Sequence, residues 1–246
     1  MRVAIHQPNF LPWLGIFQRL FLVDVFLFFD HVQAMGGRSW LSRNRLLVGG
    51  QEYWLTMPVR KSGRLGQKVV EVEINYQVDF VPKHLKTIEL NYRRAPHFDV
   101  VFPLLEALYL KRHTRISEFN MEFIESVARL LALPVRFART SSLARENPQL
   151  EGLKGNAQIL ETCRAAGATE YVSGGGCLDF IEPASFERSG IAFYFQRFSH
   201  PVYPQIGSRQ FVANLSILDA LFNAGVPRTQ EMIMQSTKDR PMEYAA

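Results

Sequence analysis

The fold is decided by RVAIHQPNFLPWLGIFQRLFLVDVFLFFD, residues 2–30. Its first five residues are a short apolar and β-branched run that predicts a buried strand, and Pro8 and Pro12 then exclude regular structure. From Gly15 to Leu22 the apolar residues follow a helical period, and residues 25–29 are again continuously apolar. The order strand, loop, helix, strand is typical of a βαβ unit, whose two strands are parallel.

The rest of the chain continues this alternation of helices and strands. We expect helices at 80–92, 101–110, 116–131, 156–166 and 211–223, strands at 69–74, 135–137, 171–172 and 191–195, a hairpin at 46–59 around Gly49-Gly50, a polar loop at 139–153, and a fraying tail after Arg228. The sequence therefore predicts an α/β fold with a mostly parallel, Rossmann-like sheet flanked by helices. We expect one domain over residues 1–228 with a helix-rich insertion at about 80–133, followed by a polar tail over 229–246.

Composition excludes several classes of protein. With 246 residues, 47% of them hydrophobic and 21% charged, the chain can bury a large core and is not expected to be disordered. No apolar run is long enough for a membrane span, and the polar residues from His6 to Asn9 interrupt any signal peptide, so we expect a cytoplasmic protein. Cys163 and Cys177 lack a CxxC spacing and the six histidines are dispersed, so we expect no disulfide framework and no metal site.

The charge balance favours anionic partners. The formal net charge is +5 and the isoelectric point is near 9.3, which suits a nucleotide-linked or carrier-bound small molecule. The densest basic cluster comprises Arg38, Arg43, Arg45, Arg60, Lys61 and Arg64. No nucleic-acid-binding motif accompanies it, so we do not expect a nucleic-acid partner.

Polar residues directly after the first two predicted strands are the leading site candidates. In parallel sheets, ligands bind beyond the carboxyl ends of the strands, which is where His6 and Asp30 fall. Either side chain could act as a general base. The neighbouring candidates for substrate binding are Gln7, Asn9, Trp13 and Gln33. A structural histidine and an aspartate that caps a loop are the alternatives.

Three further segments carry candidate residues. Arg43, Asn44 and Arg45 could grip phosphate or carboxylate, or form a solvated basic loop. In the run 173–176, Ser173 is a candidate catalytic residue and the amides of Gly174 and Gly175 could bind an oxyanion, although a simple turn fits equally well. The two prolines of segment 199–205 stiffen a loop that could bind a ligand or only connect two elements. Its candidate binding residues are His200, Tyr203 and Gln205, and Asp219 of the predicted last helix is a further candidate.

Several long motifs occur in a fixed order along the chain: AIHQPNFLPWLGIF at 4–17, DVFLFFDHVQ at 24–33, SWLSRNRL at 39–46, YWLTMPV at 53–59, GATEYVSGGG at 167–176, FSHPVYPQ at 198–205 and LSILDALFNAG at 215–225. Together they resemble the WbqC-like protein family, from Arg2 to about Gly225. The resemblance implies an enzyme of surface-polysaccharide or specialised-metabolite biosynthesis that transfers an acyl or amino-acyl group to an amine of a nucleotide-linked sugar or related small molecule. His6 or Asp30 would then deprotonate the amine, while Ser173 and the glycine amides stabilise the oxyanion.

Two other function classes stay open. The first βαβ unit is similar in layout to that of pantothenate synthetases and related nucleotidylyltransferases, which would make the chain a nucleotide-dependent ligase or nucleotidylyltransferase. Their His-x-Gly-His signature is absent, because the corresponding place reads Leu11-Pro12-Trp13-Leu14-Gly15. The other class is a non-catalytic protein that binds a nucleotide sugar or a carrier protein, and an acyl carrier protein is also a candidate partner of the transferase. The sequence assigns no cofactor.

These interpretations lead to one geometric expectation. The strands that end at His6, Asp30 and Ser173 should present these three side chains to one shared cleft at the carboxyl edge of the sheet. A structure that places His6 and Ser173 on opposite edges of the sheet, or that seals either one in an apolar core, would contradict it.

Overall fold

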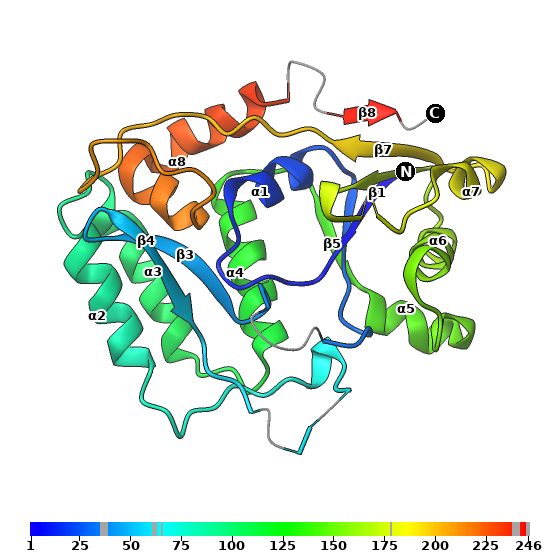
Figure 1. Ribbon diagram of the computed structural model, residues 1–246, viewed down its shortest axis with the longest axis horizontal. Coiled ribbons are helices and arrows are strands. Elements are labelled where there is room, and N and C mark those ends of the chain that lie inside the picture. The colour runs from blue at the N-terminus through cyan, green and yellow to red at the C-terminus, as the bar shows by residue number, and fades with distance from the viewer. Residues whose placement is uncertain (35–38, 61–62, 65, 178, 238–241, 245–246) are drawn as a thin grey trace.

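The computed structural model describes residues 1–34, 39–60, 63–64, 66–177, 179–237 and 242–244. Its centre is a six-stranded sheet in the order β5-β2-β1-β6-β7-β8 (Figure 1). The strands are β1 (Arg2–His6), β2 (Val25–Phe28), β5 (Arg136–Arg139), β6 (Glu170–Ser173), β7 (Ala192–Gln196) and β8 (Met242–Tyr244). The first five of these are parallel, and β8 pairs with β7 antiparallel.

The strand order locates the point where a ligand is expected. From β1 the chain first adds β2 and β5 on one side and then adds β6 and β7 on the other side of β1. Numbered along the chain, the parallel strands therefore lie in the order third, second, first, fourth, fifth, which is that of Rossmann folds. The predicted fold class is confirmed. The order reverses between β1 and β6, and ligands of such sheets bind outside the carboxyl ends of the strands at this reversal.

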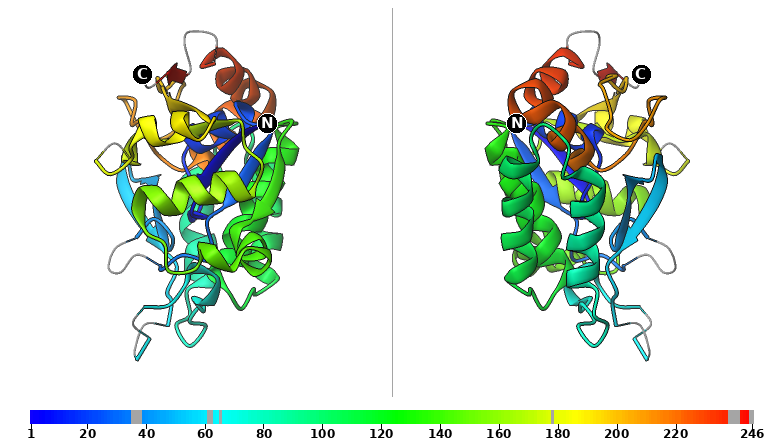
Figure 2. Two further views of the ribbon diagram at one scale, coloured as in Figure 1. Left: turned by 90° about the vertical axis from the view of Figure 1, so that its right-hand side faces the viewer. Right: turned by 90° about the vertical axis from the view of Figure 1, so that its left-hand side faces the viewer.

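Helices cover both faces of the sheet (Figure 2). On one face lie α1 (Leu14–Phe21), α4 (Ile116–Leu130) and α8 (Ile217–Gln235), and on the other lie α5 (Thr140–Glu146), α6 (Gly155–Ala165) and α7 (Pro183–Arg188). Successive side chains of a strand alternate between these faces. In β1, Val3 and Ile5 therefore pack in the core under α6, while Ala4 packs in the core under α1.

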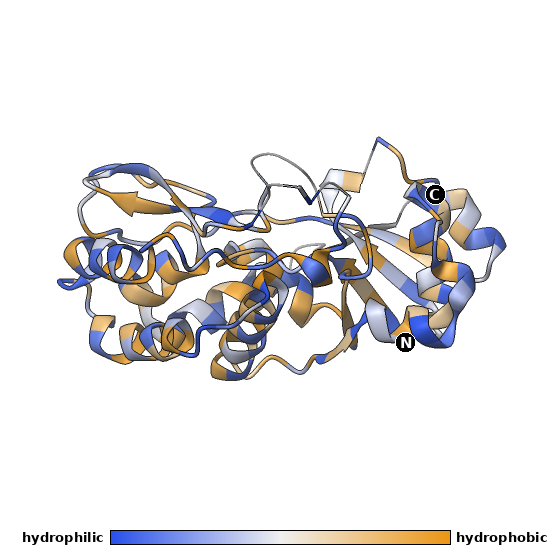
Figure 3. Cartoon of the chain, turned by 90° about the horizontal axis from the view of Figure 1, so that it is seen from below, coloured by the Kyte–Doolittle hydropathy of each residue, from blue (hydrophilic) through white to orange (hydrophobic). Residues whose placement is uncertain are grey.

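The chain between β2 and β5 enlarges the core on the α1 face. It contains the antiparallel hairpin of β3 (Arg43–Val48) and β4 (Gln51–Thr56), the helices α2 (Val81–Tyr92) and α3 (Phe98–Leu110), and α4. Short 3-10 helices occur at Val69–Glu71, Pro148–Leu150 and Gly175–Cys177. In Figure 3, hydrophobic and hydrophilic residues alternate along most helices, as expected for helices that bury one side.

Two buried amides hold the loop between β1 and α1. Asn44 Nδ2 donates to the carbonyl oxygens of Phe10 (3.1 Å) and Leu11 (2.8 Å). Asn120 Nδ2 donates to the carbonyl oxygens of Pro8 and Leu41, at 2.8 Å each. Leu11 has a φ of 40°, a left-handed conformation that costs a leucine strain energy, and these bonds help to retain it. The loop is therefore tied both to β3 and to α4.

Most predicted elements are present, and three predictions are wrong. Residues 69–74 were expected to form a strand, but 69–71 form a 3-10 helix and only isolated bridges follow. The expected loop 139–153 contains α5. Asp30, which follows β2, caps the start of this helix by accepting from the Ser141 amide. The last helix begins at Ile217 instead of residue 211, and its backbone breaks at Gly225 (φ 77°), just after the expected end at residue 223. A second helical stretch then runs to Gln235, past the predicted tail boundary, and β8 adds an edge strand. Each depends on contacts distant in sequence, which local periodicity does not report.

No helix in the described ranges combines the length and the apolar character that crossing a bilayer requires.

Replacing Asn120 with alanine is expected to lower the free energy of unfolding by about 2–3 kcal/mol, because two buried carbonyl groups lose their donor. Urea denaturation measures the change. Ser126→Ala, at an exposed position of the same helix, is the matched control and should stay within about 0.5 kcal/mol of the wild type. Equal stability of the two variants would mean that Asn120 does not hold the loop.

Candidate functional site

A cleft of about 490 Å³ lies at the carboxyl edge of the sheet, on the side covered by α6. Its volume is within the range of small-molecule sites. The walls come from the segments after β1 and β2, from Gly66 and Lys68 just before the first 3-10 turn, and from residues 151–159 at the start of α6. The polar and charged side chains among them are Gln7, His31, Gln33, Lys68, Glu151, Lys154 and Gln158, and the rings of Phe29 and Phe180 add apolar surface.

His31 is the titratable group best suited to chemistry in this cleft. It is buried, with 4% of its surface exposed, and its ring meets Phe29 edge to face. Its Nδ1 lies 2.7 Å from Thr140 Oγ1, at the start of α5. Its Nε2 is buried and has no hydrogen-bond partner among the described residues. Burial lowers the pKa of His31, so the ring is neutral at pH 7.

The contacts of Thr140 identify the tautomer of this neutral ring. The Thr140 hydroxyl has one proton, and the carbonyl oxygen of Phe28 (3.0 Å) and the carboxylate of Asp30 (3.2 Å) both stand ready to accept it. A hydroxyl that donates to either oxygen accepts from Nδ1–H of His31, and this is the tautomer that the arrangement favours. Nε2 carries the free lone pair as a result, and it can accept a proton or a hydrogen bond from a bound molecule.

Two lysines and one glutamate are the charged residues that line the same cleft. Lys68 pairs with Glu151 at 2.8 Å, and Lys154 directly precedes α6. No side chain in the described part of the chain caps α6, and the amides of Asn156 and Ala157 donate to no described acceptor. Free amides and the helix dipole attract negative charge. The cleft therefore combines an anion-binding end with a neutral proton acceptor.

The three predicted catalytic residues end neighbouring strands but do not share one cleft. His6 lies on the α1 face, partly buried, with Nδ1 2.7 Å from the carbonyl oxygen of Gln7. Asp30 is fully buried and accepts from the Ser141 amide (2.7 Å) and hydroxyl (2.8 Å), so it caps α5. Ser173 is 1% exposed and points to the α6 face, where its hydroxyl donates to the carbonyl oxygen of Gly174. The expectation of one shared cleft is wrong, because Asp30 and Ser173 are buried and none of the three side chains lines the cleft.

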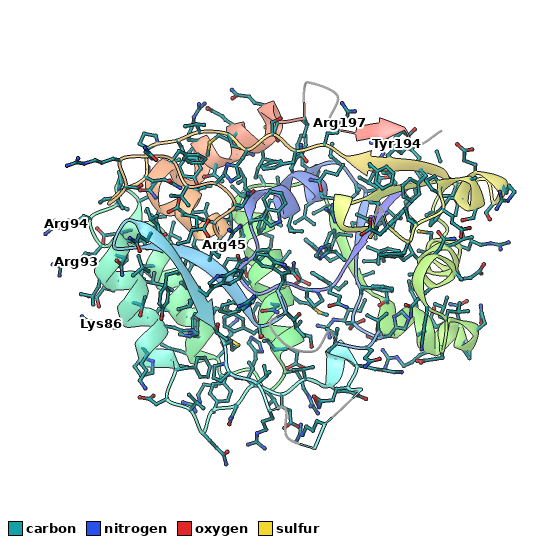
Figure 4. All side chains as sticks on the ribbon, viewed as in Figure 1. Arg45, Lys86, Arg93, Arg94, Tyr194 and Arg197 are labelled. Carbon is teal, nitrogen blue, oxygen red and sulfur yellow. The ribbon has the colours of Figure 1, made fainter. Side chains whose placement is uncertain are left out.

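The predicted arginines lie on the hairpin, outside the residues that line the cleft. Arg43 stacks on Trp54 at 3.9 Å, and Arg45 donates to Glu52 (2.9 Å) and to the carbonyl oxygen of Asn214 (3.1 Å). Figure 4 shows Arg45 over the half of the molecule that contains the hairpin and α8. Asn44 is buried, and its side-chain amide donates to the loop between β1 and α1.

The two described members of the basic cluster that remain pair with a carboxylate of the protein itself. Arg60 and Arg64 pair with Glu73. Arg38 and Lys61 lie outside the described residues.

Asp219 and the loop residues form a buried network that supports the fold. The Asp219 carboxylate accepts from Tyr203 (2.9 Å), Gln205 (2.7 Å) and Tyr92 (2.9 Å). Burial raises the pKa of Asp219, although the three hydrogen bonds oppose the shift. His200 packs against Phe211, and burial lowers its pKa. These side chains join α8, α2 and the segment after β7, and none of them lines the cleft.

The start of α1 is covered, unlike the phosphate-binding helix start of nucleotidylyltransferases. The indole of Trp13 lies over Gly15, where an added Cβ would overlap with the ring, and it packs on Phe198 at 5.0 Å. Trp13 and the partly buried Asn9 do not line the cleft, whereas the predicted Gln7 and Gln33 do.

Sequence reasoning missed His31, Lys68, Lys154 and Gln158. His31 follows Asp30 directly, so the strand-end argument that selected Asp30 could have found it. Lys154 stands just before a predicted helix, which is a second available signal. Lys68 offered none, because its position depends on the turn that replaced a predicted strand. No group of three or more histidine, cysteine, aspartate or glutamate side chains in the described ranges is arranged to hold a metal ion.

Comparison with known proteins gives one family and one relative. The model of the WbqC-like protein family matches residues 7–231. The "Uncharacterized protein Rv1507c" of Mycobacterium tuberculosis is 31% identical over 226 residues, which cover 91% of this chain and 94% of that protein. No solved structure is significantly similar to this chain.

The acid sensitivity of the fold should depend on His6. Burial, and next to it the positive charge of Arg19, lower the pKa of His6 from 6.5 to about 4. An unfolded chain then binds a proton at this site that the folded chain does not, so His6 contributes stability that is present above pH 6.5 and is lost as the pH falls toward 4. The loss is at most about 3 kcal/mol. Urea titrations at pH 7.5 and pH 4.5 should show a smaller loss in His6→Gln than in the wild type. Identical losses would contradict the assignment.

Proposed function

The chain belongs to the WbqC-like protein family, and we propose that it is an enzyme that transfers an acyl or amino-acyl group to an amine of a nucleotide-linked sugar or a related small molecule. We propose that the enzyme acts in bacterial surface-polysaccharide or specialised-metabolite biosynthesis, which is the role that the family resemblance implies. The observation that carries the proposal is the unpartnered Nε2 of a neutral, buried histidine in a cleft at the carboxyl edge of the sheet.

His31 is the general base in this proposal, in place of Asp30. The acceptor amine attacks the carbonyl carbon of an acyl thioester, an amide C–N bond forms, and the C–S bond breaks. Nε2 takes the proton that the amine nitrogen loses, and the leaving thiolate receives that proton afterwards. Thr140 positions the ring through Nδ1, as the orienting partner of a catalytic histidine does.

The basic end of the cleft suits a substrate that carries phosphate. Lys154 and the free amides at the start of α6 would bind the diphosphate of a nucleotide-linked sugar, and Lys68 could exchange Glu151 for the ligand. Gln7 and Gln33 are the sequence-predicted residues that border this space, and we propose that they bind polar groups of the sugar. A net charge of +5 also suits an acidic acyl carrier protein as the donor.

The other sequence-predicted roles are weaker parts of the proposal. His6 and Ser173 stay predicted catalytic residues on the strand-end argument alone, and the arginines stay predicted ligands. Nothing at the start of α1 favours a nucleotidylyltransferase, since Trp13 occupies the place that phosphate would need.

A direct assay tests the transfer. The protein is incubated with a panel of amino-sugar nucleotides and acyl thioesters, and amide products are detected by mass spectrometry. His31→Gln should reduce kcat/KM at least about a hundredfold, because general-base catalysis contributes roughly 10²–10⁴. His113→Gln, outside the residues that line the cleft, is the control and should keep full activity. Unchanged turnover in His31→Gln overturns the role of His31. Tight binding of a nucleotide sugar without turnover would support the binding-protein alternative.

The pH dependence of the reaction provides a second test. His31 acts in its neutral form, and burial lowers its pKa below 6.5. We expect log kcat/KM, corrected for the ionisation of the free amine substrate, to level off toward pH 8 and to fall with unit slope below the pKa of His31, as the base becomes protonated. A base that titrates above pH 7 would show that another group removes the proton.

A further inference from the structure

Arg19 is a buried cation without an anionic partner. It belongs to α1, and 5% of its surface is exposed. Its Nε donates to Gln196 Oε1 at 2.8 Å, and no carboxylate of the described residues pairs with it. A buried guanidinium that lacks a counter-charge is destabilising, because burial removes its hydration without supplying an opposite charge. A fold retains such a group where a bound anion offsets the cost.

The guanidinium is held in one orientation. Gln196 Nε2 donates to the carbonyl oxygen of Gly15 (2.7 Å) and to Gln18 Oε1 (2.5 Å). Gln18 Nε2 in turn donates to the backbone oxygens of Arg197 and Ser236, at 3.0 Å each. Gln196 occupies only Nε of Arg19, so both terminal nitrogens of the guanidinium are left for other acceptors. Neither of them has a hydrogen bond within the described residues.

The terminal nitrogens lie against the glycine loop at the end of β6. A Cβ added at Gly174 would overlap with Arg19 Nη2, so only glycine leaves room for the guanidinium here. The adjoining Gly175 and Gly176 are exposed, and their amides donate to no acceptor in the described ranges. The guanidinium and the two amides therefore present several donors at the carboxyl end of β6, where the strand order reverses.

We infer that Arg19 and the amides of Gly175 and Gly176 form a phosphate-binding subsite at the reversal between β1 and β6. A guanidinium fork and backbone amides together match the three acceptor oxygens of a phosphate group. The subsite lies on the α1 face, beside His6, whereas the cleft with His31 lies on the α6 face. The inference rests on the proposed function only in one respect, which is that a nucleotide-linked substrate carries a phosphate group. Its test measures phosphate binding and needs no turnover.

Inorganic phosphate is the probe. Its dissociation constant for the full chain is measured by titration, with the thermal midpoint followed at constant ionic strength in chloride. Arg19→Met should weaken phosphate binding at least tenfold while the midpoint without phosphate stays equal or rises, because an unpaired buried charge is removed. Arg209→Met removes the same charge from an exposed loop and should leave binding unchanged.

Gly174→Ala distinguishes the subsite from a general loss of stability. The added methyl group displaces the guanidinium, which is the movable end of a long side chain, and should weaken phosphate binding at least tenfold. The thermal midpoint of this variant without phosphate shows that it is folded. Absence of phosphate binding to the wild type, or equal binding in Arg19→Met or in Gly174→Ala, overturns the inference. Loss in Arg209→Met to the same degree overturns it as well.

Discussion

The hydrogen bonds of two buried amides, Asn44 and Asn120, keep the loop after the central strand in place, and both sides of the carboxyl edge depend on that loop. Asn44 comes from the hairpin and Asn120 from α4, so two separate insertions between β2 and β5 converge on one short segment. The loop carries Gln7 toward the cleft and leads into α1, which carries Arg19. The strained φ of Leu11 shows that tertiary contacts, and not local preference, determine its path.

The pleat of β1 divides the polar groups between two environments. His6 and Arg19 belong to the α1 face, and Gln7 and the His31 cleft belong to the α6 face. The two environments differ in their chemistry. The α6 side offers a proton acceptor, lysines and a helix start, while the α1 side offers a fixed guanidinium and a glycine loop. A substrate with a reactive amine at one end and phosphate at the other could use both.

A recurring feature of this protein is the use of neutral donors around buried charge. Asp219 accepts from two tyrosines and one glutamine, and Asp30 accepts from one serine and one threonine. Both carboxylates are fully buried and both lie at the start of a helix, where the free amides and the dipole stabilise negative charge. Their role in the fold is thus explained without a ligand, which separates them from His31 and Arg19, whose outward nitrogens lack partners in the described chain.

The sequence by itself determined the fold class, because the apolar run of β1, the two prolines, the period of α1 and the run of β2 each report local geometry that a βαβ unit needs. The same signals located the edge where His6, Asp30 and the glycine loop end. Tertiary structure alone decided which side chains meet there. Asp30 and His31 are neighbours in the chain and both contact Thr140 at the start of α5, yet His31 lines the cleft while Asp30 is sealed against the helix start that it caps. Lys68 and Arg19 reach their positions through a turn and a helix whose placement depends on packing between residues far apart in the chain, and no local pattern encodes such contacts.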